Sequence, residues 1–140
     1  MKKTKIEINN LAKGKIGLKF LEKFAEKVLK LVKLKIPELS VVLVCDRRMK
    51  SFNKKFRKQN RTTDVLAFDY GLPFGGQGEI IICLDQAKRQ AEELKHPLKE
   101  ELEILLIHGI LHLLGYNDET KKQRDEMIKK QDKILLKFKS

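Results

Sequence analysis

The chain has 140 residues, 41% of them hydrophobic, and its 31 Lys and Arg residues outnumber its 19 Asp and Glu residues to give a net charge of +12. This length and apolar content predict one compact domain over residues 1–140 with a real hydrophobic core, and the longest apolar run, which contains two histidines, is too short and too polar to span a membrane. The positive charge attracts polyanions such as nucleic acids, although abundant lysine and glutamate are also typical of hyperthermophile protein surfaces.

The amino-terminal residues and the cysteines indicate a soluble, cytoplasmic protein. Residues 1–5 are basic like the start of a signal peptide, but no apolar stretch of the required length follows them. Cys45 and Cys83 each end an apolar run, where reduced and buried thiols of cytosolic proteins are commonly found. They lack the paired spacing of metal-binding cysteines, and a disulfide between neighbouring strands is the less favoured alternative.

The first half of the chain predicts two strands and two helices. Residues Lys5 to Asn9 alternate between polar and apolar and form the first strand. The next segment has an apolar stripe at positions 18, 21, 25, 28 and 32, which is the spacing of an amphipathic helix. Residues Leu39 to Cys45 are continuously apolar, as in a strand covered on both faces. Asp46 is then expected to cap the second helix.

That second helix and the residues just after it form the densest cluster of cations. The cluster comprises Lys50, Lys54, Lys55, Arg57, Lys58 and Arg61. Phe52 and Phe56 lie on the apolar face of the helix, and we assign them to packing, although aromatic rings beside cations can also stack on bases. We predict that Lys54, Lys55, Lys58 and Arg61 contact nucleic acid.

Two further strands follow, over Thr63 to Tyr70 and Glu79 to Cys83. The glycine-rich loop between them has the composition of a hairpin-like connection and lacks the spacing of a phosphate-binding loop, so no nucleotide cofactor is expected. Asp64 and Glu79 are the acids expected nearest to any metal held at this sheet, and ordinary strand-end polarity is their alternative reading.

Three helices complete the chain. Asp85 is expected to cap a helix through Lys95, and Pro97 begins the next helix, which has acids in its first turn. His96 precedes that proline in a charged loop, where a solvated role is expected. The last helix follows Asp118 and has one stripe formed by Met127, Gln131, Ile134 and Phe138.

His108 and His112 are four residues apart in an apolar helical run, so their imidazoles share one helix face and can converge on one ion. Gly115 suits the residue that follows a helix end, and it lets the chain swing Asp118 back as a carboxylate ligand. Two satisfied core histidines are the simpler alternative. Burying two imidazoles among leucines and isoleucines is costly without partners, which favours a shared cation.

Gly109 occupies the position where zinc proteases of the His-Glu-x-x-His type place their general base. Any hydrolytic water must therefore be activated by the metal and by a group from elsewhere in the chain, which argues against ordinary peptide hydrolysis. Glycine also lowers helix propensity, so close packing or ligand access must account for its presence.

The run from His108 to Tyr116, His-Gly-Ile-Leu-His-Leu-Leu-Gly-Tyr, closely resembles the signature of the YbeY family of bacterial metal-dependent endoribonucleases, which are linked to ribosomal RNA maturation. The resemblance extends to residues 53–58, 62–68 and 78–83, in the same order. The family pattern has a histidine as the third metal ligand, whereas this chain has Asp118 there, so oxygen replaces nitrogen. Glu119 is the fallback ligand.

The resemblance implies an active-site role for Arg57, and a guanidinium can grip two phosphate oxygens at once. It also implies ribosomal RNA and the small ribosomal subunit as partners, with a part in ribosome quality control.

The order of elements predicts an α+β fold. The chain is expected to form a single metal-dependent hydrolase domain, in which a mixed β-sheet of about four strands packs with about five helices. The histidine helix then presents the metal site.

We therefore expect hydrolysis of single-stranded RNA with Arg57 as the catalytic clamp and one divalent metal, zinc, on His108, His112 and Asp118. Two alternatives from other classes stay open. Two histidines and one carboxylate also suit Fe(II) oxygenases, although nothing in the sequence suggests a co-substrate site. A non-enzymatic RNA-binding ribosome-assembly factor with a structural metal is the stronger rival, and it predicts RNA binding without cleavage.

Overall fold

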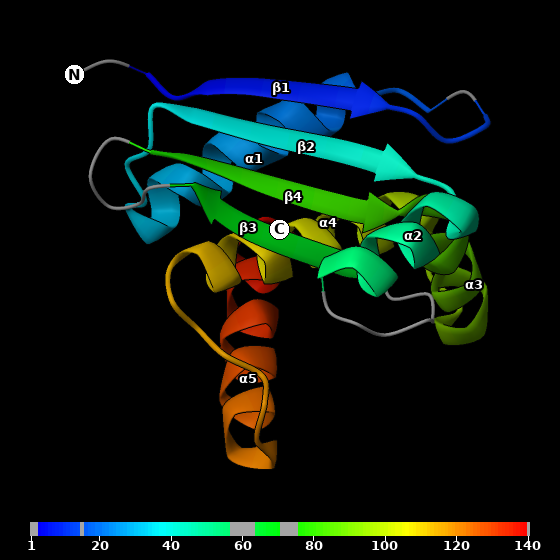
Figure 1. Ribbon diagram of the computed structural model, residues 1–140. Coiled ribbons are helices and arrows are strands. Elements are labelled where there is room, and N and C mark those ends of the chain that lie inside the picture. The colour runs from blue at the N-terminus through cyan, green and yellow to red at the C-terminus, as the bar shows by residue number, and fades with distance from the viewer. Residues whose placement is uncertain (1–2, 15, 57–63, 71–75, 140) are drawn as a thin grey trace.

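Figure 1 shows the computed structural model of the chain, which describes residues 3–14, 16–56, 64–70 and 76–139. Within these ranges the elements are β1 (Lys5–Asn10), α1 (Lys19–Val32), β2 (Glu38–Val44), α2 (Asp46–Phe56), β3 (Val65–Tyr70), β4 (Gln77–Cys83), α3 (Leu84–Leu94), α4 (Leu98–Leu113) and α5 (Lys121–Lys137). The predicted α+β fold, with four strands and five helices in the described residues, is confirmed.

The four strands form one mixed sheet in the order β1-β2-β4-β3. Strands β1, β2 and β4 are parallel, whereas β3 runs antiparallel to β4, which follows it in the chain. Strand β4 lies between β2 and β3, and its residues Ile80 to Cys83 are almost fully buried. A continuous apolar run is what a strand covered on both faces requires.

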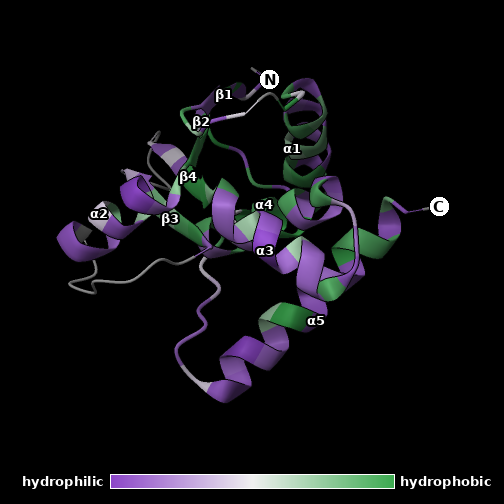
Figure 2. Cartoon of the chain, turned by 90° about the vertical axis from the view of Figure 1, so that its right-hand side faces the viewer, coloured by the Kyte–Doolittle hydropathy of each residue, from purple (hydrophilic) through white to green (hydrophobic). Residues whose placement is uncertain are grey.

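Alternate residues of β4 belong to two separate apolar clusters, one on each face of the sheet. Ile80 and Ile82 pack into the larger cluster with buried residues of α1 and α4, whereas Ile81 and Cys83 join Met49 of α2 in the smaller one. Helices α1 and α4 therefore cover one face and α2 the other, as Figure 1 shows. Figure 2 shows hydrophilic residues along α2, α3 and α5, which lie toward the outside.

Gly109 allows α4 to approach the sheet closely. A Cβ atom at this position would lie 2.8 Å from Cγ2 of Ile80 and 2.9 Å from its Cδ1. Ile80 is fully buried and β-branched, so it has little freedom to move away. Gly78 of β4 has a matching role, because a Cβ there would lie 2.7 Å from Leu113. Of the two explanations for Gly109, the structure supports close packing.

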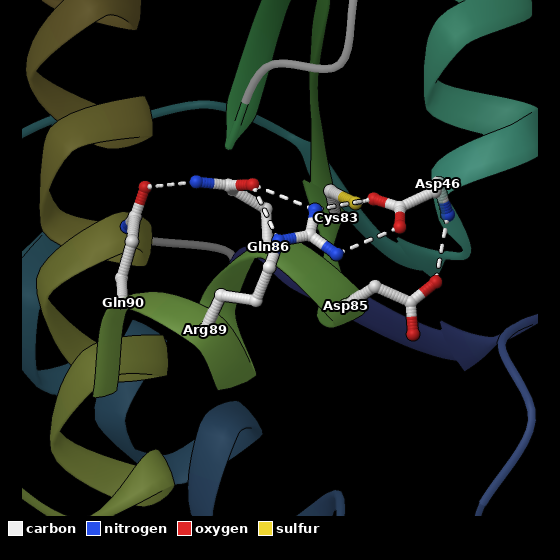
Figure 3. Close-up of polar contacts among 6 residues, drawn as sticks. All are labelled: Asp46, Cys83, Asp85, Gln86, Arg89 and Gln90. Carbon is white, nitrogen blue, oxygen red and sulfur yellow. Dashed lines mark hydrogen bonds and ion pairs between the residues drawn. The ribbon is translucent and has the colours of Figure 1, made fainter. Parts of the chain in front are cut away.

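The prediction that Asp46 and Asp85 each cap the helix that follows them was wrong, because their side chains have other partners, as Figure 3 shows. Helix α2 begins at Asp46 itself, whose carboxylate accepts hydrogen bonds from Nη1 and Nη2 of Arg89 at 2.8 and 2.7 Å. These bonds hold the pKa of Asp46 below its usual range. Asp85 lies inside α3, after the N-cap residue Cys83, and its Oδ2 accepts the backbone N–H of Asp46 at 2.8 Å. Asp85 therefore caps the neighbouring helix α2.

We predict that Asp85→Ala lowers the free energy of unfolding by about 1 kcal/mol, because it leaves the first N–H of α2 without its acceptor. Asp85→Asn retains a side-chain oxygen and is expected to lose less. Urea denaturation of both variants beside the wild type measures the difference. Equal losses of stability in the two variants would show that the charge of Asp85, and not its role as hydrogen-bond acceptor, stabilises the start of α2.

The prediction that His96 is solvated was wrong. His96 belongs to a buried polar cluster at the start of α4. Its Nε2 lies 2.6 Å from Oε1 of Glu101, a side chain in a residue that is only 2% exposed. Gln90 of α3 donates to the other oxygen of Glu101 at 2.7 Å. The cluster links α3 to α4, so the role of His96 is structural.

Candidate metal centre

His108 and His112 lie in the last two turns of α4, and Asp118 lies in the loop that follows this helix. The helix ends at Leu113, and Gly115 has a φ of 105°, a conformation that glycine adopts without strain. The backbone N–H groups of Gly115 and Tyr116 donate to carbonyls of the last helical turn, at His112 and Leu111. The chain therefore turns back as predicted and brings Asp118 to the histidines.

The three side chains place one ligand atom each around a common point. Nε2 of His108 lies 3.1 Å from Nε2 of His112, and each of these nitrogens lies 3.4 Å from Oδ2 of Asp118. A tetrahedral metal ion with bonds of about 2.0–2.1 Å separates its ligand atoms by about 3.3–3.4 Å. The observed distances therefore match the edges of such a tetrahedron, and the residues fit a bound divalent ion.

The outward-facing nitrogens of both rings already have acceptors. Nδ1 of His112 lies 3.0 Å from the backbone carbonyl oxygen of Tyr116, and Nδ1 of His108 lies 3.0 Å from Oε1 of Gln131 in α5. Because a carbonyl oxygen can only accept, each Nδ1 carries the proton and each Nε2 presents a lone pair. Two lone pairs and a carboxylate oxygen thus converge, an arrangement that a cation stabilises.

Burial lowers the pKa of His112, and the neighbouring His108 lowers it further, whereas the Asp118 carboxylate acts in the opposite direction. The imidazole is therefore neutral near pH 7, which is the form that binds a metal. The side chain of Asp118 is 34% exposed and both imidazoles are about a quarter exposed, so the centre is open to solvent on one side.

A small cavity of about 130 Å³ lies over the three side chains and is bounded by residues 64–68 at the start of β3. Asp64 lines this cavity, as the sequence predicted. Glu79 does not line it, and its Oε1 instead accepts a hydrogen bond from the Tyr70 hydroxyl at 3.1 Å. Glu119, the fallback ligand, is exposed and lies outside the His108, His112 and Asp118 group.

The predicted cationic residues are only partly within the described chain. Lys54 and Lys55 are exposed in the last turn of α2. Arg57, Lys58 and Arg61 lie outside the described residues, so their roles stay predictions.

The sequence analysis did not identify Gln131 as a hydrogen-bond partner of His108. A signal was available, because Gln131 is a polar residue within the apolar stripe of the last helix.

Comparison with known proteins gives consistent matches over nearly the whole chain. A family model described as "Endoribonuclease YbeY" matches residues 4–139. The protein named Endoribonuclease YbeY in Aquifex aeolicus is 40% identical over 129 residues, which are 90% of this chain and 86% of that protein. The protein of the same name in a Sulfurihydrogenibium species is 41% identical over 139 residues, covering 95% of this chain and 91% of its own length.

A solved structure has the same fold. A protein from Thermotoga maritima, known from a solution structure, is 36% identical in sequence to this chain. The match covers 93% of this chain and 86% of that protein, with a TM-score of 0.63.

None of the helices among the described residues has the length and apolar character needed to cross a membrane.

Proposed function

This chain belongs to the YbeY family of endoribonucleases, and from that premise we propose that it hydrolyses phosphodiester bonds of single-stranded RNA at a metal centre formed by His108, His112 and Asp118. The observation that supports the proposal most directly is the convergence of three ligand atoms at the spacing of a tetrahedral ion. The endoribonuclease names of the relatives favour an enzyme over an assembly factor that only binds RNA.

Zinc is the metal that we propose. Two imidazole nitrogens and one carboxylate oxygen are a common ligand set of catalytic zinc, which keeps a fourth position open for water or substrate. When bound, such an ion supplies a Lewis acid that polarises a phosphate oxygen and activates water for attack on phosphorus. The side chain of Asp118 is 34% exposed, so water or substrate can approach this ligand set from solvent.

The remaining residues of the proposed machinery bind RNA. Lys54 and Lys55 project from the last turn of α2 into solvent, and they lead directly into the segment with Arg57, Lys58 and Arg61. In our proposal Arg57 donates two hydrogen bonds to the scissile phosphate and offsets the negative charge that develops there. The other cations contact neighbouring phosphates, and the net charge of +12 accelerates encounter with RNA.

We further propose ribosomal RNA, within or near the small ribosomal subunit, as the substrate in the cytoplasm, with cleavage serving rRNA maturation and ribosome quality control. The family resemblance supports this assignment, and the absence of phosphate-loop spacing in the sequence supports a reaction that uses no nucleotide cofactor.

The test is cleavage of an end-labelled single-stranded RNA by protein stripped of metal and then reloaded with zinc. Reloaded protein is expected to cut the strand internally, a chelator to stop the reaction, and excess zinc to restore it. A duplex of the same sequence is the control substrate and is expected to resist cleavage. RNA that is bound but uncut under all metal conditions would support the non-enzymatic assembly factor in place of the enzyme.

A further inference from the structure

The last helix reaches the metal centre through one polar side chain. Helix α5 packs on α4 with its buried residues Met127, Ile134 and Leu135. Gln131 is four residues after Met127 and three before Ile134, so helix geometry places it on the same face. Its Oε1 lies 3.0 Å from Nδ1 of His108, although much of α5 projects away from the sheet (Figure 1).

The two histidines obtain their outer partners in different ways. His112 donates from Nδ1 to the backbone carbonyl of Tyr116, which belongs to the turn that ends its own helix. His108 donates from Nδ1 to a side chain that is 23 residues away in sequence and belongs to another helix. The orientation of His112 therefore follows from the local fold of α4, whereas that of His108 depends on how α5 is placed.

The acceptor on Gln131 determines which nitrogen of His108 faces the cluster. A proton held on Nδ1 leaves the lone pair on Nε2, the atom that lies 3.1 Å from His112 and 3.4 Å from Asp118. Without that acceptor, the ring is free to carry its proton on Nε2 or to rotate, and either change removes a ligand atom. Loss of such an outer partner typically costs about 10–100-fold in metal affinity.

We propose that Gln131 is a positioning residue for the metal centre, which fixes the tautomer and the ring plane of His108 from the C-terminal helix. The inference rests on the proposed metal site and adds to it a dependence of metal affinity on the docking of α5. The amide oxygen of Gln131 meets this need because it accepts from Nδ1 and cannot donate to it.

Three variants test this role. Gln131→Leu removes the acceptor and keeps an apolar side chain of similar length against α4. Gln131→Glu retains an acceptor oxygen and is the conservative variant. Asp132→Leu introduces leucine at the adjacent, exposed position of α5. It is the matched control for the effect of a leucine on the stability of the helix and on the hydrophobicity of its surface.

Zinc affinity is measured by competition with a chromophoric zinc chelator, and urea denaturation of the metal-free proteins is measured in parallel. We expect Gln131→Leu to bind zinc about 10–100-fold more weakly without a lower unfolding midpoint, and Gln131→Glu and Asp132→Leu to bind close to the wild type. In the zinc-loaded wild type, NMR should show a Nδ1–H resonance of His108 protected from exchange, and Gln131→Leu should lose this protection.

Wild-type zinc affinity in Gln131→Leu would overturn the inference and leave the metal site intact. An equal loss in Asp132→Leu would also overturn it, since the effect would then reflect the stability of α5. A wild-type protein that binds no zinc would overturn the metal site itself and this inference with it, so the two failures are distinguishable.

Discussion

His112→Ala should abolish detectable cleavage of single-stranded RNA. The substitution removes one of three ligand atoms that surround the proposed ion, and His108 and Asp118 alone leave the coordination incomplete. Removal of a hydrogen-bond partner of a metal ligand costs about 10–100-fold in metal affinity or activity. The loss of activity in His112→Ala should be larger, because a ligand itself is lost. Activity of the zinc-supplemented variant, its zinc content and its far-UV circular dichroism are the measurements.

A matched control is available in His96→Gln. It removes a histidine at the opposite end of α4 from His108 and His112, and it keeps a side-chain N–H donor for the buried Glu101. This variant should cleave RNA and bind zinc like the wild type. If His112→Ala, purified identically, cuts RNA as fast as the wild type, the activity comes from a contaminating nuclease or needs no metal at this site, and the proposed mechanism is wrong.

Arg57→Ala should lower the rate of RNA cleavage by about 10²–10³-fold, which is the usual cost of removing a donor that stabilises developing negative charge. The role of Arg57 is implied by the family resemblance, and it predicts a loss in kcat without a change in zinc affinity, because the ligand set does not include this residue. Arg57→Lys keeps the charge but loses bidentate binding, so its rate should lie between those of the wild type and Arg57→Ala. Single-turnover cleavage and zinc competition are the measurements.

Arg47→Ala is the control for charge, because Arg47 is an exposed arginine in the first turn of α2, ten residues before Arg57 in the sequence. Its loss should weaken RNA association slightly and leave the rate of the bound complex unchanged. Equal rates in Arg57→Ala and Arg47→Ala would show that the segment attracts RNA only by its charge, with no clamp on the scissile phosphate.

The sequence by itself determined those features that depend on neighbours a few residues apart. His108 and His112 share a helix face because of helical periodicity, and Gly115 permits the turn that returns Asp118 to them. The order and type of the elements followed from apolar periodicity in the same way, with boundaries within a few residues of those observed. The grouping of His108, His112 and Asp118 was therefore predictable from the sequence.

The tertiary structure decided which distant groups meet. Strand β4 lies between β2 and β3, Asp85 caps α2, and Gln131 accepts from His108. Each of these contacts joins residues from different elements, and local pattern indicates that a polar side chain needs a partner without saying which one. Asp64 and Glu79 were equivalent in sequence, and only the antiparallel pairing of β3 with β4 placed Asp64 at the cavity and Glu79 beside Tyr70, because strand register determines where each side chain lies.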